Sequence, residues 1–403
     1  MKWRIGLLCW LLTSTAQAQD WRWSYLLEGR SYNYDDKSWA SAADTLVPQP
    51  ESVHTADLEL NLDAESIVFT AAAVDEAEDD ELVVRELYYR ADLAGGEALV
   101  GRRISSFGVG NAFRPLDLIQ RSDLLTHDLQ TPTGVNQLAW ERFADLSVFG
   151  VYLAHPENDN QEHEAEQPAL LARYAEAGDV GDWQVLARIS DANRWQVATG
   201  GVWLPSDAVA LYGSLRYSRR DFRQQHSFSG RVTTPLASND PWSSVAIENA
   251  IASVLGLNWT QSQRSNIVVE YWHDPAAMSN SQWQDLFDLM ASQHALIDSA
   301  VPQDVVQSNL AWSALAWQKP QRLRDNLMLR YQWQGDVLSF VSSLLYTPAD
   351  GGNMLQAQII REFQQFGGFK LRFGLRTFDG PTRSLYGQMT RRDELLFSIY
   401  GDF

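Results

Sequence analysis

Apolar and polar residues alternate with a period of two along much of this chain, and the pattern is clearest over residues 369–376. One face of that segment carries Phe369, Leu371, Phe373 and Leu375, and the other carries Lys370, Arg372, Gly374 and Arg376. Successive side chains of a β-strand point to opposite faces, so the alternation predicts strands. The pattern recurs over residues 209–217 and 326–333 and is typical of the strands of a transmembrane barrel.

Residues 1–18 have the three parts of a secretory signal. A positively charged start, a short apolar core over residues 5–12 and an Ala-Gln-Ala cleavage site ending at Ala18 follow one another. The core is far shorter than the roughly 20 residues of a spanning helix. Because the single cysteine, Cys9, lies in this segment, we expect an exported mature chain of residues 19–403 without thiols.

The chain ends in another alternating segment. One of its faces carries Leu395, Phe397, Ile399, Gly401 and Phe403. A terminal aromatic residue on such a strand resembles the carboxy-terminal signal by which Gram-negative outer-membrane barrels are recognised for assembly. The resemblance implies that Phe403 is an assembly signal, with the barrel-assembly machinery and periplasmic chaperones as partners.

The composition fits a location in the outer membrane. The formal net charge is −19, and binding to nucleic acid is excluded because it needs clustered Lys and Arg. After the signal, no apolar run approaches the roughly 18 residues of a helical membrane span. The 16 Trp, 14 Tyr and 16 Phe suit aromatic girdles at both membrane interfaces. We therefore expect contact with outer-membrane lipid and lipopolysaccharide.

The links between the alternating segments come in two sizes. Short turns include residues 63–66, 94–96, 204–207 and 319–321, and long polar links cover about 35–52, 75–81, 105–131, 154–166, 219–244 and 273–304. Tight periplasmic turns and longer outer loops alternate in this way in outer-membrane barrels. We predict an all-β fold, one transmembrane antiparallel β-barrel of about 18 strands (range roughly 16–20) over residues 19–403. Its last hairpins are expected around residues 384–390 and 394–403.

The segment from Gly101 to Asp117 leaves a predicted strand and enters a long link. It resembles the Gly-Arg-x…Trp-Gly-x-Gly…Pro-x-Asp stretch of porin-like outer-membrane proteins, which include the alginate-export barrels and related proteins of unassigned function. Phe107 stands where that stretch has Trp, and residues 269–273 and 378–381 extend the resemblance. The resemblance implies a porin-like barrel. The functional interpretation of the segment is a constriction loop that folds inward to narrow the pore, with Phe107, Gly108, Gly110, Phe113, Arg114, Pro115 and Asp117. The alternative is an outer loop packed on the barrel rim.

Residues 281–297 predict a short amphipathic helix within an outer loop. Its apolar residues include Trp283, Leu286, Phe287, Leu289 and Met290, and its other face carries Gln284, Asp285, Asp288 and Gln293. The apolar stripe must be buried, most simply at the barrel mouth. The helix is then either a lid or plug for the pore or a packing element that stiffens the loop.

Charged residues recur at the inward positions of the predicted strands. We expect the pore to be lined by Arg90, Arg103, Arg216, Glu270, Arg330, Lys370, Arg372 and Arg376. Arg or Lys facing lipid at the midplane costs about 2–4 kcal/mol, so these side chains should face water. A basic row would favour anionic solutes. The alternative is an Arg–Glu network that only braces the lumen.

Two acidic runs, residues 75–81 and 157–166, are rich in the oxygen ligands that Ca²⁺ prefers. His155 and His163 accompany the second run. Neither run has the spacing of an EF-hand. We expect solvated loops, bridged loosely by divalent ions to lipopolysaccharide, and we predict no metal site and no cofactor.

Three functional interpretations follow. The first is a porin for diffusion or export of small anionic solutes, such as a sugar acid, organic acid or polysaccharide, acting as a monomer or a trimer. The second is a non-conducting structural or adhesive barrel plugged by its own loops. An outer-membrane hydrolase is the least favoured, because the histidines fall in or beside predicted loops and strand ends without a G-x-S-x-G motif.

Overall fold

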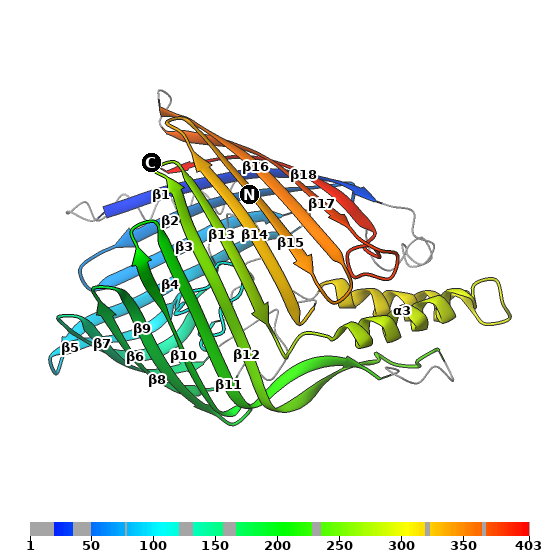
Figure 1. The fold of residues 1–403 in the computed structure, drawn as a ribbon, viewed down its shortest axis with the longest axis horizontal. Helices are drawn as coiled ribbons and strands as arrows, with labels where there is room; N and C mark the ends of the chain where they lie inside the picture. Colours follow the sequence, from blue (N-terminus) through cyan, green and yellow to red (C-terminus); the bar gives the residue numbers. More distant parts are fainter. Residues whose placement is uncertain are drawn as a thin grey trace.

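The strands form one sheet that closes on itself. The computed structural model describes residues 20–34, 50–76, 79–120, 132–155, 167–227, 235–318, 323–364 and 368–402. Within these ranges 18 strands pair in chain order, all antiparallel, and the last strand returns to the first (Figure 1). The predicted barrel of about 18 strands is confirmed. The predicted signal segment and Phe403 lie outside the described residues.

Every strand pairs with its neighbours in the sequence. The strands are β1 (Asp20–Tyr34), β2 (Ser52–Asp63), β3 (Ile67–Glu76), β4 (Asp79–Leu93), β5 (Gly96–Arg103), β6 (Val135–Ala144), β7 (Ser147–His155), β8 (Ala169–Gly178), β9 (Gly181–Ser190), β10 (Arg194–Ser206), β11 (Val209–His226), β12 (Trp242–Ser262), β13 (Ser265–His273), β14 (Asp325–Gln334), β15 (Leu338–Thr347), β16 (Gly352–Phe363), β17 (Phe369–Asp379) and β18 (Arg391–Asp402). Ser24 of β1 lies opposite Asp402 of β18, so both described ends of the chain lie at one rim.

The two rims differ in the length of their links, as predicted. Short turns join the strands at the rim that holds both chain ends, for example Gly178 to Gly181 between β8 and β9. The longest links, 104–134 and 274–324, lie at the opposite, outer rim. The prediction of a hairpin around residues 384–390 is wrong. That segment folds into local turns, in which the Ser384 N–H donates to the Pro381 carbonyl at 2.9 Å, and β18 begins only at Arg391.

Apolar side chains cover the outer face of the barrel. Leu255 projects outward with 67% of its surface exposed, whereas its neighbour Val254 faces inward and is fully buried. Phe373 and Arg372 show the same contrast, with the aromatic ring outside and the guanidinium inside. An apolar exterior around a charged interior is the arrangement that a lipid bilayer requires of a barrel.

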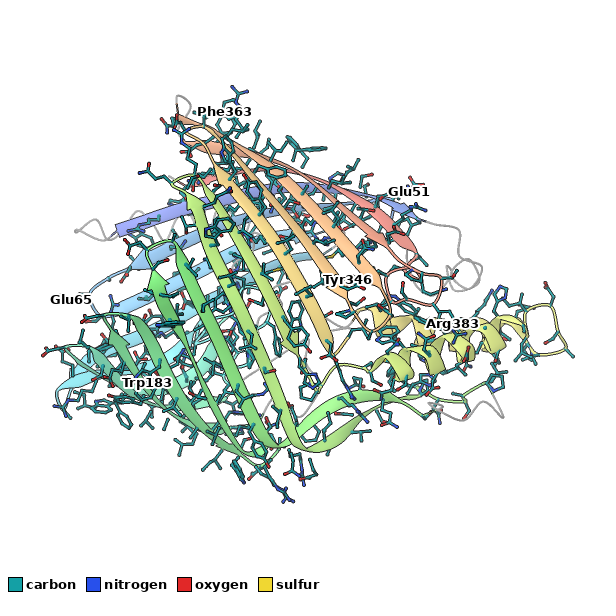
Figure 2. All side chains as sticks on the ribbon, viewed as in Figure 1. Glu51, Glu65, Trp183, Tyr346, Phe363 and Arg383 are labelled. Atoms are coloured by element: carbon teal, nitrogen blue, oxygen red, sulfur yellow. The ribbon has the colours of Figure 1, made fainter. Side chains whose placement is uncertain are left out.

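Tryptophans mark the rim with the short turns. Trp183, Trp203 and Trp259 all face outward and lie within a few residues of short turns. Figure 2 shows Trp183 at this end of the barrel and Arg383 at the other. Rings in this position suit one aromatic girdle at the membrane–water interface.

Two helices lie in the long link between β13 and β14. α3 (Asn280–His294) begins with a capping box, in which Ser279 and Gln282 each accept the other's backbone N–H through their side chains. α4 (Gln303–Ala314) follows, and a short turn, η1 (Leu315–Gln318), ends the pair. The helices project from the outer rim beside the tips of β11 and β12 (Figure 1). No helix among the described residues is long and apolar enough to cross a membrane.

The interior contains two apolar clusters. One lies on the inner wall of β5–β10 and includes Leu116, Leu171 and Leu186, which have no exposed surface. The other joins the inner wall of β11–β17 to the helices and includes Trp272 and Trp283. Both clusters contain residues of the link that follows β5, so that link lies inside the barrel.

Candidate functional site

The link after β5 follows the inner wall of the barrel. Residues 104–120, here called the inward loop, have no regular secondary structure. Leu116 and Ile119 of the loop are buried against inward side chains of β5–β10. Further along the wall, the ring of Phe113 stacks on that of Trp272 in β13, with centroids 6.3 Å apart. Because β13 lies eight strands from β5 in the ring of 18, the loop spans nearly half of the circumference.

Glu270 on β13 anchors the inward loop. Its side chain projects into the barrel and has no exposed surface. One carboxylate oxygen accepts the backbone N–H groups of Ala112 (2.9 Å) and Phe113 (3.0 Å). The other accepts the N–H of Asn111 (2.6 Å) and the hydroxyl of Tyr212 (2.8 Å). Hydrogen bonds to an ionised group each stabilise by about 1.5–3 kcal/mol. Glu270 is inward as predicted, and its carboxylate is bonded to the loop.

Asp117 holds the loop in its folded shape. Its buried carboxylate accepts the N–H groups of Phe107 (2.6 Å) and Gly108 (2.8 Å) and the hydroxyl of Ser106 (3.0 Å). Burial raises the pKa of Asp117 above its ordinary value, and the two N–H groups act against that rise. Two buried carboxylates, one from the wall and one from the loop, therefore fix the inward loop.

Close packing of the loop backbone explains its glycines. A Cβ at Gly108 would overlap the side chain of Arg114, and a Cβ at Gly110 would overlap the carbonyl oxygen of Phe113. Arg114 donates to the Gly110 carbonyl at 2.9 Å, and Pro115 is buried. All the residues proposed for a constriction loop thus lie inside the barrel. Their effect on solute passage stays a prediction.

The aromatic ring of Phe107 meets an arginine of the wall. The guanidinium of Arg173 on β8 lies over the ring, 4.9 Å from its centroid. Gln184 on β9 orients this arginine by accepting a hydrogen bond from its Nε at 3.0 Å. The same Gln184 donates to the backbone carbonyl of Phe107. Arg173 is therefore held in a fixed orientation beside the inward loop.

Most of the arginines expected to line the pore have an acidic partner. Arg103 pairs with Glu141 at 3.3 Å, Arg216 with Asp221 at 2.7 Å, Arg376 with Glu394 at 3.0 Å, and Arg372 with Glu28. Arg90 lies at the short-turn rim, where it pairs with Asp63 at 2.7 Å. An ion pair carries little net charge. These arginines therefore match the alternative stated above, an Arg–Glu network that braces the lumen without selecting anions.

Three other inward cations differ from these pairs. Among the described residues no carboxylate lies within 4.0 Å of Arg173, Arg330 or Lys370. All three side chains are partly exposed, and the Lys370 ammonium lies 5.9 Å from the centre of the Tyr400 ring. Glu270 and Asp117, by contrast, are buried against the inward loop. Lys370 lies directly opposite Glu362 of β16, whose carboxylate is more than 4.0 Å away, so Arg173 and Arg330 are the inward cations that lie farther from acidic side chains.

The apolar face of α3 is buried in the cluster that it shares with η1 and the inner wall. The predicted helix residues Trp283, Phe287 and Met290 are buried, and the Trp283 ring lies 5.0 Å from that of Trp317 in η1. Gln293, expected on the polar face, is also fully buried and donates to the Pro235 carbonyl at 2.9 Å. That expectation is wrong because a backbone acceptor satisfies the buried amide.

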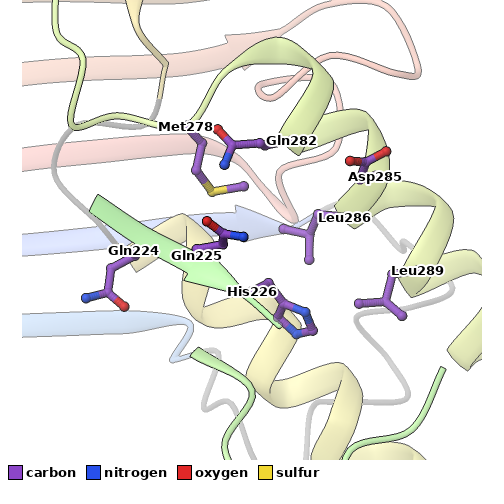
Figure 3. A pocket seen from close by; sticks show the side chains of 8 residues that line it. All are labelled: Gln224, Gln225, His226, Met278, Gln282, Asp285, Leu286 and Leu289. Carbon is purple, nitrogen blue, oxygen red and sulfur yellow. The ribbon is translucent and has the colours of Figure 1, made fainter. Parts of the chain in front are cut away.

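The helices and the tip of the β11–β12 hairpin (residues 220–226 and 242–248) form a structure that we call the outer lobe. His226, at the end of β11, is buried beneath α3 and faces Leu286 and Leu289 (Figure 3). Its ring stands edge-on to Trp242, 5.1 Å away. Trp242 in turn donates to the Trp312 carbonyl in α4 at 2.7 Å. The lobe is thus packed around one buried histidine.

Several residues of the site carry no clear signal in the sequence. Arg173 lies in a strand in which half of the residues are Ala or Gly, so the alternation is weak. Tyr212 is inward by its alternation, but its bond to Glu270 depends on the pairing of β11 with β12 and of β12 with β13. The long link reaches residue 324, beyond the predicted 304, and contains the unpredicted α4.

The acidic runs remain untested as cation sites. Residues 157–166 and the side chains of residues 76–80 lie outside the part of the chain that the structure describes. Within the described part, no three His, Cys, Asp or Glu side chains are grouped so that they would hold a metal ion.

Solved structures share this fold, although no protein-family model and no curated protein matches the sequence. The chain is similar to Pseudomonas aeruginosa OccK11 (OpdR), with a TM-score of 0.58 and 8% identity over 96% of both chains. It is similar to Acinetobacter baumannii OccAB1, with a TM-score of 0.56 and 7% identity over 96% of both chains. It is also similar to P. aeruginosa OccK2 (OpdF) in complex with glucuronate, with a TM-score of 0.55 and 10% identity over 96% of this chain and 98% of that one. The fold is therefore that of Gram-negative outer-membrane porins.

Proposed function

We propose that the protein is an outer-membrane channel through which small anionic solutes diffuse, such as sugar acids, organic acids or segments of polysaccharide. The fold supports the outer-membrane location, and the apolar exterior described above suits a bilayer. The inward loop supports a narrowed pathway, because it occupies part of the lumen and is held by Glu270 of the wall and by its own Asp117.

The observation that carries the proposal is the distribution of charge in the lumen. Arg173, Arg330 and Lys370 are partly exposed and have no described carboxylate within 4.0 Å, whereas Glu270 and Asp117 are covered by the loop. Cations on the walls of a narrow, low-dielectric passage raise the local concentration of anions. The bound glucuronate of OccK2 is a sugar acid, which is consistent with this class of solute.

A plugged barrel is the second candidate. It is favoured by the apolar cluster that joins Phe113 of the inward loop to Trp272 of the wall and Trp283 of α3. Such a cluster resists the passage of polar solutes. Reconstitution in planar bilayers separates the candidates, because a channel gives steady current steps and a plugged barrel gives none.

Liposome swelling tests the solute class. We expect glucuronate to enter proteoliposomes faster than glucose, which has a similar size and no charge. Equal rates for the two solutes would remove the preference for anions and leave a general diffusion pore.

The remaining expectations stay predictions. They are contact with lipid and lipopolysaccharide, assembly by the barrel-assembly machinery with periplasmic chaperones, and a monomeric or trimeric state. We expect no catalysis in the lumen, since none of the described histidines projects into it.

A further inference from the structure

Three polar residues form a row on the outer face of the barrel. Ser253 of β12 lies directly opposite His273 of β13, and His273 lies opposite Asp325 of β14. Their strand neighbours show which way they point. Leu255, two residues after Ser253, and Tyr271, two residues before His273, are exposed on the outer surface, and residues two apart in a strand share a face. A serine, a histidine and an aspartate therefore lie side by side on one face of three adjacent strands.

The histidine and the aspartate are in contact. His273 Nδ1 lies 2.9 Å from Asp325 Oδ1, and the hydroxyl of Tyr271 donates to the same oxygen at 2.7 Å. An aspartate that accepts the Nδ1–H leaves Nε2 of the imidazole as the proton acceptor. The carboxylate thus fixes both the tautomer and the orientation of the ring.

Ser253 lies on the other side of the same histidine. Directly opposite residues of an antiparallel pair have Cβ atoms about 4.5–5.5 Å apart, so a serine rotamer can bring Oγ toward the ring. Within the described residues Ser253 and His273 share no hydrogen bond. Bonds between a nucleophile and its base are often long without substrate and tighten when substrate binds.

The position of the row identifies a class of substrate. His273 is the last residue of β13 and Asp325 the first of β14, so the row lies where the wall meets the outer links. The outward neighbours Ile251, Leu255 and Leu215 are exposed and apolar. Acyl chains would lie along this surface, with their ester groups near the polar row at the membrane interface.

We propose that Ser253, His273 and Asp325 form a hydrolase site on the outer wall, which cleaves carboxylic esters of lipids in the outer leaflet. Ser253 Oγ attacks the ester carbonyl carbon while His273 Nε2 takes its proton. The C–O bond to the lipid alcohol breaks, and that alcohol leaves with the proton from His273. Water then attacks the acyl-serine with His273 as base and releases the fatty acid. Ser253 and His273 are the catalytic residues, and Asp325 is a positioning residue.

This activity is independent of the proposed channel, because the row faces lipid and the channel lies inside. The test uses the purified full-length barrel in detergent micelles, with a p-nitrophenyl acyl ester and a phospholipid as substrates. A fluorophosphonate probe, which reacts only with activated serines, reports on the nucleophile directly. Heat-modifiable migration shows that each variant is folded, whether or not the barrel conducts.

We expect hydrolysis by the native chain and covalent labelling at Ser253. Ser253→Ala should lower hydrolysis about 100-fold or more and abolish the label. The matched control is Ser342→Ala, since Ser342 is a partly buried serine at an outward position of β15, opposite Tyr331 and Ala357 rather than a histidine. Asp325→Asn should slow labelling of Ser253 while the heat-modifiable migration stays unchanged.

Two results would overturn the proposal. One is a folded native protein that neither hydrolyses the esters nor takes the label. The other is hydrolysis or labelling that survives Ser253→Ala, which would place the activity elsewhere.

Discussion

The carboxylate of Glu270 and the backbone nitrogen of Asn111 lie 2.6 Å apart, although 159 residues separate them in the sequence. This bond joins the loop that leaves β5 to a strand nearly opposite in the ring. Two further backbone N–H groups of the loop donate to the same carboxylate. One wall residue therefore fixes how far the inward loop fills the lumen.

Glu270→Gln should release the middle of the loop, residues 111–113, from the wall. The variant lacks the charge, and its amide NH₂ faces backbone N–H groups that need an acceptor. We expect a loss of about 2–4 kcal/mol in the docking of the loop. Single-channel recordings should then show larger and noisier currents. Glu65→Gln, at an exposed position in a short turn, is the control, and currents of native size in Glu270→Gln would refute the anchoring role.

Gly110→Ala should disturb the same loop from within. The added methyl group would overlap the carbonyl oxygen of Phe113, so the backbone must move. We expect faster proteolysis of the loop at equal protease concentration. Gly29→Ala is the matched control, because its nearest neighbour is a ring atom of His54 at 3.2 Å, which can adjust. Equal cleavage of both variants would show that the close approach is unimportant.

Arg372→Gln should weaken the closure of the barrel. Arg372 of β17 pairs with Glu28 of β1 and donates to the Ser398 hydroxyl at 3.0 Å, all in a buried position. Removing one partner of a buried pair costs about 3–5 kcal/mol. The unfolding midpoint in urea should fall, and Glu28→Gln added to Arg372→Gln should restore part of the loss.

An exposed ion pair serves as the control for the Arg372→Gln variant. Arg264 and Asp336 form an ion pair at 2.8 Å on the surface near the short turns. Exposed pairs contribute about 0–1 kcal/mol, so Arg264→Gln should leave the midpoint nearly unchanged. A similar fall for both variants would contradict the role given to burial.

The outer lobe should lose stability in acid. Burial lowers the pKa of His226 to about 4 from its ordinary value of 6.5, although Asp240 acts in the opposite direction, and Asp285 of α3 also borders the cavity beside it. Below pH 6.5 the unfolded lobe takes up a proton that the folded lobe does not. Stability is therefore greatest above pH 6.5 and falls as the pH drops to about 4, by about 3 kcal/mol in all.

Hydrogen exchange in α3 and α4, corrected for the intrinsic pH dependence, measures this loss. His226→Gln lacks the titrating group, so its lobe should show a flatter dependence on pH. If both chains responded equally to pH, His226 would not be the group responsible.

The sequence was sufficient for the fold because its signals are local. The alternation predicts the strands, and the unequal lengths of the links predict the two rims. The spacing of Trp283, Phe287 and Met290 predicts α3. The helix α4 was missed because its buried face includes Asn309 and Ser313. Their partners, the Ala237 backbone and the Gln293 side chain, lie in other segments. The two polar residues therefore interrupt the apolar periodicity by which a buried helix face is recognised in a sequence.

The contacts of the lumen depend on distant segments and were less predictable. The alternation places Arg372 inside, but its pairing with Glu28 joins residues 344 positions apart. The basic row expected from the sequence is therefore largely a set of ion pairs. Arg173 gave no signal because its orientation comes from Gln184 and Phe107, on another strand and on a loop.

The reversal potential of the protein in planar bilayers under a KCl gradient measures the ion selectivity on which the proposed function depends. We predict an anion preference for the native chain. It should be lost when Arg173, Arg330 and Lys370 are all changed to Gln, and kept when the paired residues Arg376 and Glu394 are changed to Gln together. A cation-selective native channel, or a triple variant with unchanged selectivity, would show that these three cations do not set the ion preference.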